Sequence, residues 1–190
     1  RMIDSIRNRY DIDGGAKITV DNGDMEVGSV RGIRQRVEDP KGRVGMTTVR
    51  EHFSELSAPN GKIVTGDVRD TVKLDADTII TLNLVDNIKV TGKNILVYGT
   101  KVTYDVEFFL KKGGKIRFYD QGSGFDISDD AIINLENGKK INIRDLKRDK
   151  LISLGGKDIT YDYIDDRENI KKSAKNNSGN KFGFGKMFHK

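Results

Sequence analysis

Short apolar runs, rich in valine, isoleucine, phenylalanine and tyrosine and separated by glycine and asparagine, dominate the chain. Runs of this length and composition are typical of β-strands. In residues 78–85 apolar side chains fall on both alternating sets of positions, so we expect a central strand that is buried on both faces. The predicted strands are 17–20, 25–30, 62–64, 71–74, 78–85, 87–90, 94–98, 102–110, 115–120, 131–135 and 140–143.

Three turns between these runs predict β-hairpins. The turns are formed by Asn22 and Gly23, by Gly113 and Gly114, and by Asn137 and Gly138. A two-residue hairpin turn needs positive φ at its central positions, which asparagine and glycine tolerate. We therefore predict three antiparallel strand pairs.

Helical signals are few. Thr48 and Glu51 have the spacing of a capping box, which predicts a short amphipathic helix that ends before Pro59. Residues 144–150 allow at most two helical turns. An N-terminal helix with Met2, Ile3 and Ile6 on one face and a helix from Asp166 to about residue 175 are also expected.

Together these elements predict a mainly β fold: a compact antiparallel β domain built of hairpins, with a few short helices and a flexible, basic C-terminal segment. The strands do not alternate regularly with helices, which argues against a doubly wound parallel sheet. No internal repeat is evident at the periods typical of repeat proteins. We expect the domain to span 1–166, with 31–60 as an inserted loop or helix, and the basic, glycine-rich segment to span 167–190.

The charge of the chain is concentrated near its C-terminus. The 190 residues have a net charge of +5, yet 167–190 contain seven lysine or arginine residues and one glutamate. The preceding residues are therefore nearly neutral. A basic segment can bind phosphate backbones by releasing counterions, so nucleic acid is a possible partner of 167–190.

Composition excludes several classes of protein. The chain has no cysteine and only two histidines, His52 and His189, which excludes disulfides, thiolate zinc sites and histidine-rich metal sites. No apolar run approaches the roughly 20 residues of a membrane-spanning helix, and the segment 1–13 does not resemble a secretory signal. We expect a soluble protein without metal or cofactor and without a membrane partner, located in the cytoplasm or, if viral, in the virion.

Two groups of acidic residues are candidate metal sites. Asp75 and Asp77 share one face of a predicted strand and could hold a divalent ion, but no third ligand follows at a recognisable spacing. A nuclease-like site could be formed by Asp105, Glu107 and Lys111, but here too no further ligand follows at a recognisable spacing. Turn and capping roles explain these carboxylates more simply.

An aromatic and basic segment offers a candidate nucleic-acid site. Lys111, Lys112, Arg117 and Tyr119 lie within one predicted hairpin, and single-strand-binding domains combine cationic side chains with aromatic rings on which bases stack. Successive side chains of a strand point to opposite faces of the sheet, so at most one of Phe108 and Phe109 can stack on a base. Core packing is the competing explanation for these rings.

Three segments in order resemble the blocks of a Hint domain, the hedgehog/intein fold. Residues 12–30 (IDGGAKITVDNGDMEVGSV) are similar to the opening block, 102–152 to the middle block with its Asn-Gly hairpin and Asp-Leu-Lys segment, and 180–189 (NKFGFGKMFH) to the closing block. The resemblance covers less than half of the chain. It implies a β fold that brings both chain ends and the middle block together.

A protein-splicing function is what this resemblance implies, with the flanking host-protein segments as partners. Splicing needs an initial cysteine or serine, a middle-block histidine and a final asparagine, but Arg1, Ala131 and Lys190 stand at those places. The implied domain is therefore inactive as written. The residues at its site would be Ser128, Asp129, Asp130 and His189, with His189 close to 128–131.

Two other functions fit the same sequence. A structural β module of a virus particle or another assembly would bind copies of itself or other proteins through strand edges and terminal arms, and 31–60, with five arginines, could form such an arm. A single-stranded nucleic-acid-binding domain would use the basic and aromatic residues of 104–119.

Overall fold

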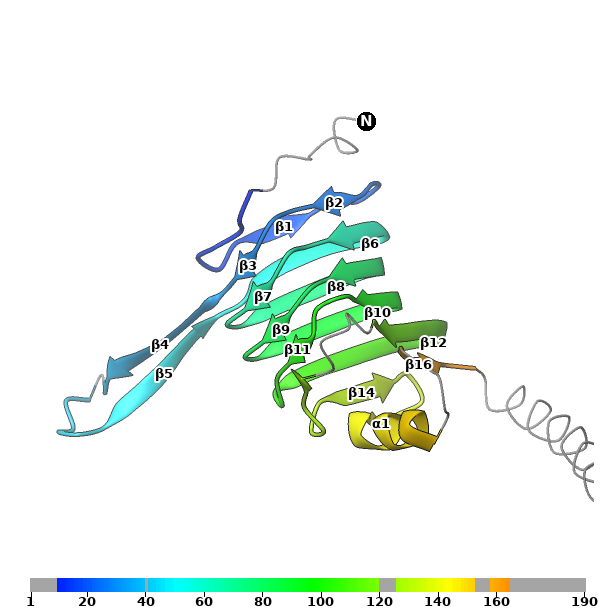
Figure 1. Cartoon of the computed structure of the whole chain (residues 1–190). Helices are drawn as coiled ribbons and strands as arrows, with labels where there is room; N and C mark the ends of the chain where they lie inside the picture. The colour runs from blue at the N-terminus through cyan, green and yellow to red at the C-terminus, as the bar shows by residue number, and fades with distance from the viewer. Residues whose placement is uncertain (1–9, 40, 120–125, 153–157, 165–190) are drawn as a thin grey trace, which may run out of the picture.

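A computed structural model describes residues 10–39, 41–119, 126–152 and 158–164. The described part is mainly β, as the sequence predicts, with one helix (Figure 1). Its elements are β1 (Lys17–Thr19), β2 (Met25–Glu26), β3 (Val30–Arg31), β4 (Ile33–Glu38), β5 (Thr47–His52), β6 (Ser54–Val64), β7 (Val68–Arg69), β8 (Val72–Thr81), β9 (Leu84–Val85), β10 (Ile88–Val97), β11 (Lys101–Val102), β12 (Val106–Phe118), β13 (Asp126–Ile127), β14 (Ile132–Leu135), β15 (Lys140–Asn142), α1 (Ile143–Ile152) and β16 (Ile159–Asp162).

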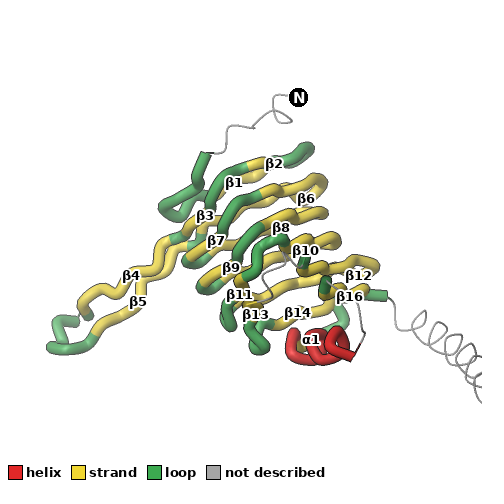
Figure 2. Tube along the Cα trace, in the orientation of Figure 1, coloured by secondary structure: helices red, strands yellow, loops and turns green. Residues whose placement is uncertain are grey.

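The chain winds between two parallel sheets. The larger sheet has the order β1-β6-β8-β10-β12-β14 and the smaller one β3-β7-β9-β11-β13, so the chain alternates between them and returns one strand further along. This path is a parallel β-solenoid, visible as a ladder of stacked coils in Figures 1 and 2. The expectation of an antiparallel domain built of hairpins was therefore wrong.

The register of the larger sheet defines the length of one coil. Val72 in β8 lies beside Ile88 in β10, and Ile88 lies beside Val106 in β12. Each of these steps along the chain is one complete coil. The resulting period is shorter than that of most repeat proteins, so a search at their periods could not detect it.

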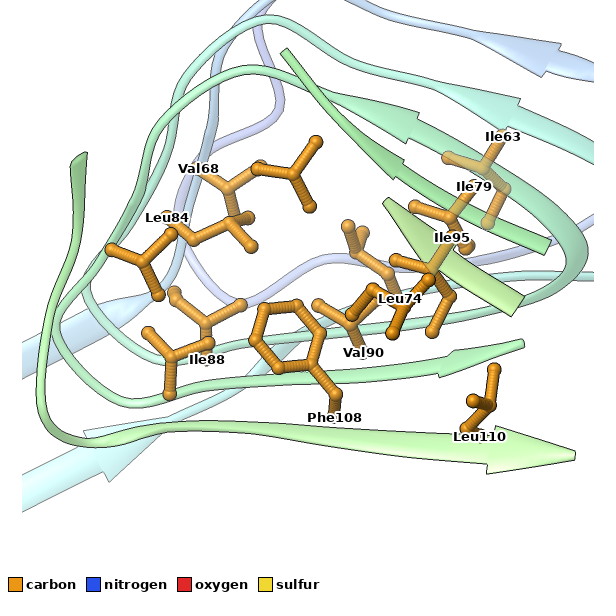
Figure 3. Packing of buried hydrophobic residues seen from close by; sticks show 14 of the residues in the cluster. Ile63, Val68, Leu74, Ile79, Leu84, Ile88, Val90, Ile95, Phe108 and Leu110 are labelled. Atoms are coloured by element: carbon orange, nitrogen blue, oxygen red, sulfur yellow. The ribbon is translucent and has the colours of Figure 1, made fainter. Parts of the chain in front are cut away.

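Aliphatic and aromatic side chains stack in columns between the sheets (Figure 3). One column of the larger sheet consists of Leu56, Leu74, Val90, Phe108 and Ile133, all buried. Each coil buries its apolar face against its neighbours, which is why a single coil could not be stable alone. The opposing column of the smaller sheet consists of Val30, Val68, Leu84, Val102 and Ile127.

The apolar segment 78–85 does not form one strand. β8 ends at Thr81, and Leu84 belongs to β9 in the smaller sheet. Ile79 is completely buried, whereas Ile80 points to the outer face and is half-buried. The double-sided pattern therefore reflects a corner of the solenoid rather than a doubly buried strand.

Two of the three predicted hairpins are absent. β1 and β2, on either side of Asn22 and Gly23, both pair in parallel with β6. β12 continues through Gly113 and Gly114. A Cβ atom on Gly114 would lie 2.0 Å from the Lys93 carbonyl oxygen, so this glycine permits close approach of the preceding coil instead of chain reversal.

The third predicted hairpin is confirmed. β14 and β15 pair antiparallel around Asn137 and Gly138, and Gly138 has a φ of 84°. α1 then packs at this end of the solenoid, next to β16, which runs antiparallel to β12. The helix contains 10 residues, longer than the two turns that were expected.

A hairpin replaces the helix predicted after Thr48. β4 and β5 pair antiparallel from Ile33 opposite His52 to Glu38 opposite Thr47. This hairpin, residues 33–52, is inserted between β3 and β6 and projects from the solenoid (Figure 1); we call it the arm. The predicted N-terminal helix, the helix after Asp166, the segment 167–190 and the chain ends lie outside the described residues.

Candidate functional site

The arm is the most exposed element of the described structure. All six residues of β5 are exposed. Val44, near the tip, is 100% exposed and Val49, in β5, is 50% exposed. The exposed valines and the two free strand edges make the arm a candidate binding element.

Ion pairs and hydrogen bonds attach the arm to the body. Arg34 pairs with Glu51 across the arm at 3.5 Å and with Asp105 of the body at 3.8 Å. Below the arm, the Ser54 hydroxyl donates to the Arg31 carbonyl at 2.7 Å and accepts from the Gly15 amide at 3.1 Å. The start of β6, which follows the insertion, is thereby fixed to the part of the chain that precedes it.

The tip of the arm is organised by one carboxylate. Asp39 accepts hydrogen bonds from the Lys41 amide and the Arg43 side chain. These two donors, the Lys41 amide first, hold the pKa of Asp39 below its ordinary value. The carboxylate is therefore charged at neutral pH and accepts both hydrogen bonds in that state.

A second candidate surface is a groove of ≈ 460 Å³ on the outer face of the larger sheet. We call it the sheet groove; it crosses β1, β6, β8, β10 and β12, which lie side by side in Figure 2. Its lining residues are Lys17, Thr19, Glu55, Leu56, Ser57, Lys73, Leu74, Asp75, Lys89, Thr91 and Phe109.

The predicted nucleic-acid residues are divided between two clusters. Lys111 pairs with Asp75 at 3.8 Å, beside the sheet groove. Arg117 instead binds Asp158 and lies over the ring of Tyr119, 4.6 Å from its centre. Lys112 is exposed on the same strand. Nucleic-acid binding by these residues stays a prediction.

Tyr119 forms an aromatic stack with the neighbouring coil. Its ring lies 4.1 Å from that of Tyr98, with an interplanar angle of 4°. Hydrogen bonding to Tyr119, followed by burial, raises the pKa of Tyr98 above its ordinary value. The ring that the sequence offers as a base platform is thus already covered on one face by tyrosine.

Ser128, Asp129 and Asp130 lie where the last coil meets α1. The Ser128 hydroxyl oxygen accepts a hydrogen bond from the Asp130 amide at 3.2 Å. Asp129 pairs with Lys147 at 2.9 Å, and Arg144 lies within 3.8 Å of Asp129 and 3.6 Å of Asp130. These contacts fasten α1 to the solenoid.

The catalytic role suggested for these three residues stays a prediction. His189, which should complete that site, lies outside the described residues, so its distance from 128–131 is undefined. The same holds for the contribution of both chain ends to a splicing site.

The carboxylates considered as metal ligands have other contacts. Asp105 accepts a hydrogen bond from the Thr103 hydroxyl at 2.6 Å, and Asp75 is paired with Lys111. Across the described ranges, no group of three histidine, aspartate or glutamate residues could hold a metal ion.

Within the described part of the chain, no helix is both long and apolar enough to cross a membrane. Comparison with protein-family models, curated proteins and solved structures found no match. The resemblance to Hint domains and the function it implies therefore stay predictions.

One feature of the sequence does indicate the sheet groove, although it is not visible within any single strand. The segments 70–74 (DTVKL) and 86–90 (DNIKV) repeat the same order of polar and apolar positions one coil apart. Stacking them in register places Lys73 beside Lys89 on the outer face. The sequence does not indicate that the arm projects from the solenoid, because its polar pattern is equally compatible with an ordinary hairpin or a helix.

Proposed function

We propose that this protein is a structural assembly module in which the solenoid is a rigid body and the arm joins it to a second copy of the chain. The exposure of every residue of β5 is the observation that carries this proposal. The joint forms by strand addition, in which the free edge of β5 pairs with the same edge of the second copy.

The two faces of the arm cannot supply its stability. One face presents Arg34, Arg36 and Glu38 with Thr47, Val49 and Glu51, and the other presents mainly polar residues as well. A two-stranded hairpin in water is marginal without a third strand or an apolar surface to pack on. The arm therefore gains most from a partner that adds strands.

The edge of β5 is open to such pairing. Sheet edges are usually protected by short strands, by charged side chains, above all lysine, by proline or by bulges. β5 has six residues, pairs with β4 without interruption and contains neither lysine nor proline, and its charged residues Arg50 and Glu51 are confined to its second half. Its Thr47, Thr48 and Val49 favour extended structure.

Charge excludes two registers of this pairing. In a two-fold antiparallel pair centred on Val49, Thr48 faces Arg50 of the second copy and Thr47 faces its Glu51, so like charges never lie opposite. Registers centred on Arg50 or Glu51 place like charges opposite each other, which destabilises a strand pair. The centred valines also cover apolar surface that is half exposed in the single chain.

Single-cysteine cross-linking tests this arrangement, because the chain has no native cysteine. Opposite residues in an antiparallel pair have Cα atoms about 4.5 to 5.5 Å apart, within the range that a disulfide bridges. Val49→Cys should form a covalent dimer rapidly under mild oxidation. Val44→Cys, at the more exposed tip, is the matched control and should react slowly.

Two results would overturn the proposal. One is equal dimer formation by both cysteine variants, which would indicate random collision. The other is faster cross-linking at Val37→Cys, which would place the joint on the β4 edge.

A further inference from the structure

The chain contains three pairs in which glycine directly follows asparagine. They are Asn22-Gly23, Asn60-Gly61 and Asn137-Gly138. In such a pair the backbone nitrogen of the glycine can attack the side-chain amide carbon of the asparagine, because glycine has no Cβ atom to obstruct the approach. All three asparagines are exposed, so their reactivity in the folded chain depends on which of the reacting groups are hydrogen-bonded.

The first pair lies in the loop that joins β1 to β2, at the end of the solenoid furthest from α1 (Figure 1). Two donors of β6 hold the ends of this loop, one at the Asp21 carbonyl at 3.1 Å and one at the Asp24 carboxylate at 2.8 Å. Between these anchors, neither the Asn22 side chain nor the Gly23 amide makes a hydrogen bond with any described residue. Both reacting groups are therefore unoccupied.

The pair in the β14–β15 turn has both reacting groups engaged. The Gly138 amide donates to the Leu135 carbonyl at 3.0 Å. The side-chain oxygen of Asn137 accepts from the Lys139 amide, also at 3.0 Å. Attack by the Gly138 nitrogen would break the first hydrogen bond, and the necessary rotation of the Asn137 side chain would break the second. The turn thereby opposes the reaction.

The pair within β6 is also constrained. The side-chain nitrogen of Asn60, which must leave in the reaction, donates to the Asp21 carbonyl at 3.1 Å. Gly61 is packed so closely that a Cβ atom there would lie 2.0 Å from the Gly23 carbonyl oxygen. Reaction at this pair would therefore cost a hydrogen bond and disturb a tight contact between coils.

We propose that Asn22 is a site of spontaneous covalent modification by water. The Gly23 nitrogen bonds to the side-chain carbon of Asn22, and the proton of that nitrogen leaves with the side-chain nitrogen as ammonia. The product is a five-membered cyclic imide. Water then opens the ring at either carbonyl, which gives aspartate or, where the chain continues through the former side chain, isoaspartate.

The modification changes the charge at one end of the larger sheet. Either product adds a carboxylate to the loop, beside the outer edge that β1 and β2 form among the described strands. Charged side chains at an exposed edge oppose pairing with another chain. The reaction therefore makes this edge a poorer site for strand addition as the protein ages. The loop shares no residue with the arm, so the proposal is independent of the proposed assembly.

Peptide mass spectrometry of the full chain, incubated folded and in guanidinium chloride at mildly alkaline pH, tests the proposal. It measures the conversion of amide to acid at each asparagine over time. The unfolded chain should react at similar rates at all three pairs. Folding should raise the ratio of the Asn22 rate to the Asn137 rate by about tenfold or more, the factor that corresponds to one hydrogen bond of about 1.4 kcal/mol.

Two variants locate the modified residue. Protein isoaspartyl methyltransferase, which transfers a methyl group to isoaspartate but not to aspartate, should label the original chain after folded incubation. Asn22→Gln should lose most of this label, because a glutamine side chain does not form the five-membered ring. Asn137→Gln, at an equally exposed position, is the matched control and should keep the label. Unchanged thermal unfolding verifies that both variants are folded.

Two results would overturn the proposal. One is a ratio of the Asn22 rate to the Asn137 rate that folding leaves unchanged or lowers. The other is equal methyl labelling of the original chain and of Asn22→Gln. Neither result depends on whether the arm forms a dimer, so the two proposals fail separately.

Discussion

Asn87 donates a hydrogen bond from its side-chain amide to the Thr71 hydroxyl, 3.3 Å away in the preceding coil. Both residues have left-handed backbone conformations, with φ of 62° and 73°. They follow Asp86 and Asp70, which are also left-handed, at the corner where the smaller sheet leads back to the larger one. The contact links equivalent corners of successive coils.

Substitution at this corner separates backbone strain from side-chain bonding. Asn87→Val should destabilise the protein by about 2 kcal/mol, because a β-branched residue is strained at positive φ and the hydrogen bond is lost. Asn87→Gly removes the same bond without strain and should cost less. Urea unfolding measures the difference, and equal losses would contradict the strain argument.

The two adjacent glycines of β12 should respond differently to alanine. Gly114→Ala places Cβ against the Lys93 carbonyl oxygen and should destabilise the protein by about 3 kcal/mol or prevent folding. Gly113→Ala meets only the end of the Lys93 side chain, at 3.8 Å. Its only penalty is the strain of alanine at a φ of 77°, which should lower the stability by about 1 kcal/mol. The order of melting temperatures tests this, and the reverse order would refute it.

Phe108 anchors the stacked core. Its ring is completely buried and meets Phe118 edge to face, with ring centres 5.5 Å apart. Phe108→Ala should destabilise the solenoid by about 3 to 5 kcal/mol, and Phe108→Leu by less because it leaves a smaller cavity. Denaturant unfolding of the two variants gives both values. A loss below about 1 kcal/mol for the alanine variant would mean that the coils do not stack through this column.

The attachment of α1 should depend on pH. Lys147 hydrogen bonding, followed by its charge, lowers the pKa of Asp129 in the folded protein. A carboxylate with a lowered folded pKa stabilises the fold above the unfolded pKa of about 3.9, and this contribution disappears as pH falls through the lower folded value. Asp129→Asn should therefore destabilise the protein at pH 7.

At a pH below the folded value of Asp129, the variant and the original chain should unfold alike, because the original carboxyl group is then also neutral. Chemical unfolding across pH 2 to 7 measures this, with Lys147→Gln as the partner variant. A difference between the two proteins that does not change with pH would exclude the ion pair as its cause.

Strand composition was enough to predict the mainly β class, and the β14–β15 hairpin followed from its Asn-Gly turn. Strand direction was not predictable from local pattern alone. A hairpin at Asn22 and Gly23 would need positive φ at these two residues, but neither has it in the loop that connects β1 to β2. Which one forms depends on β6, which lies much further along the chain and pairs with both strands.

The residues of the sheet groove are not recognisable as a group in the sequence, for a related reason. Lys73 and Lys89 become neighbours through stacking of coils, so their relation is visible only once the length of one coil is known. Lys111 and Arg117 were predicted as one cluster because they are close in sequence, yet they bind Asp75 and Asp158 in different parts of the sheet. Two residues that are close along one strand of a solenoid need not belong to the same site, because their contacts come from neighbouring coils.

Sedimentation velocity of the intact chain over a range of concentrations tests the proposed assembly most directly. The original protein should sediment as a reversible dimer, and Val49→Lys should remain a monomer, because two ammonium groups would meet on the symmetry axis. Val44→Lys, which adds the same charge at the tip, should still dimerise. A monomer at every concentration for the original chain, or an undiminished dimer for Val49→Lys, would contradict assembly through β5.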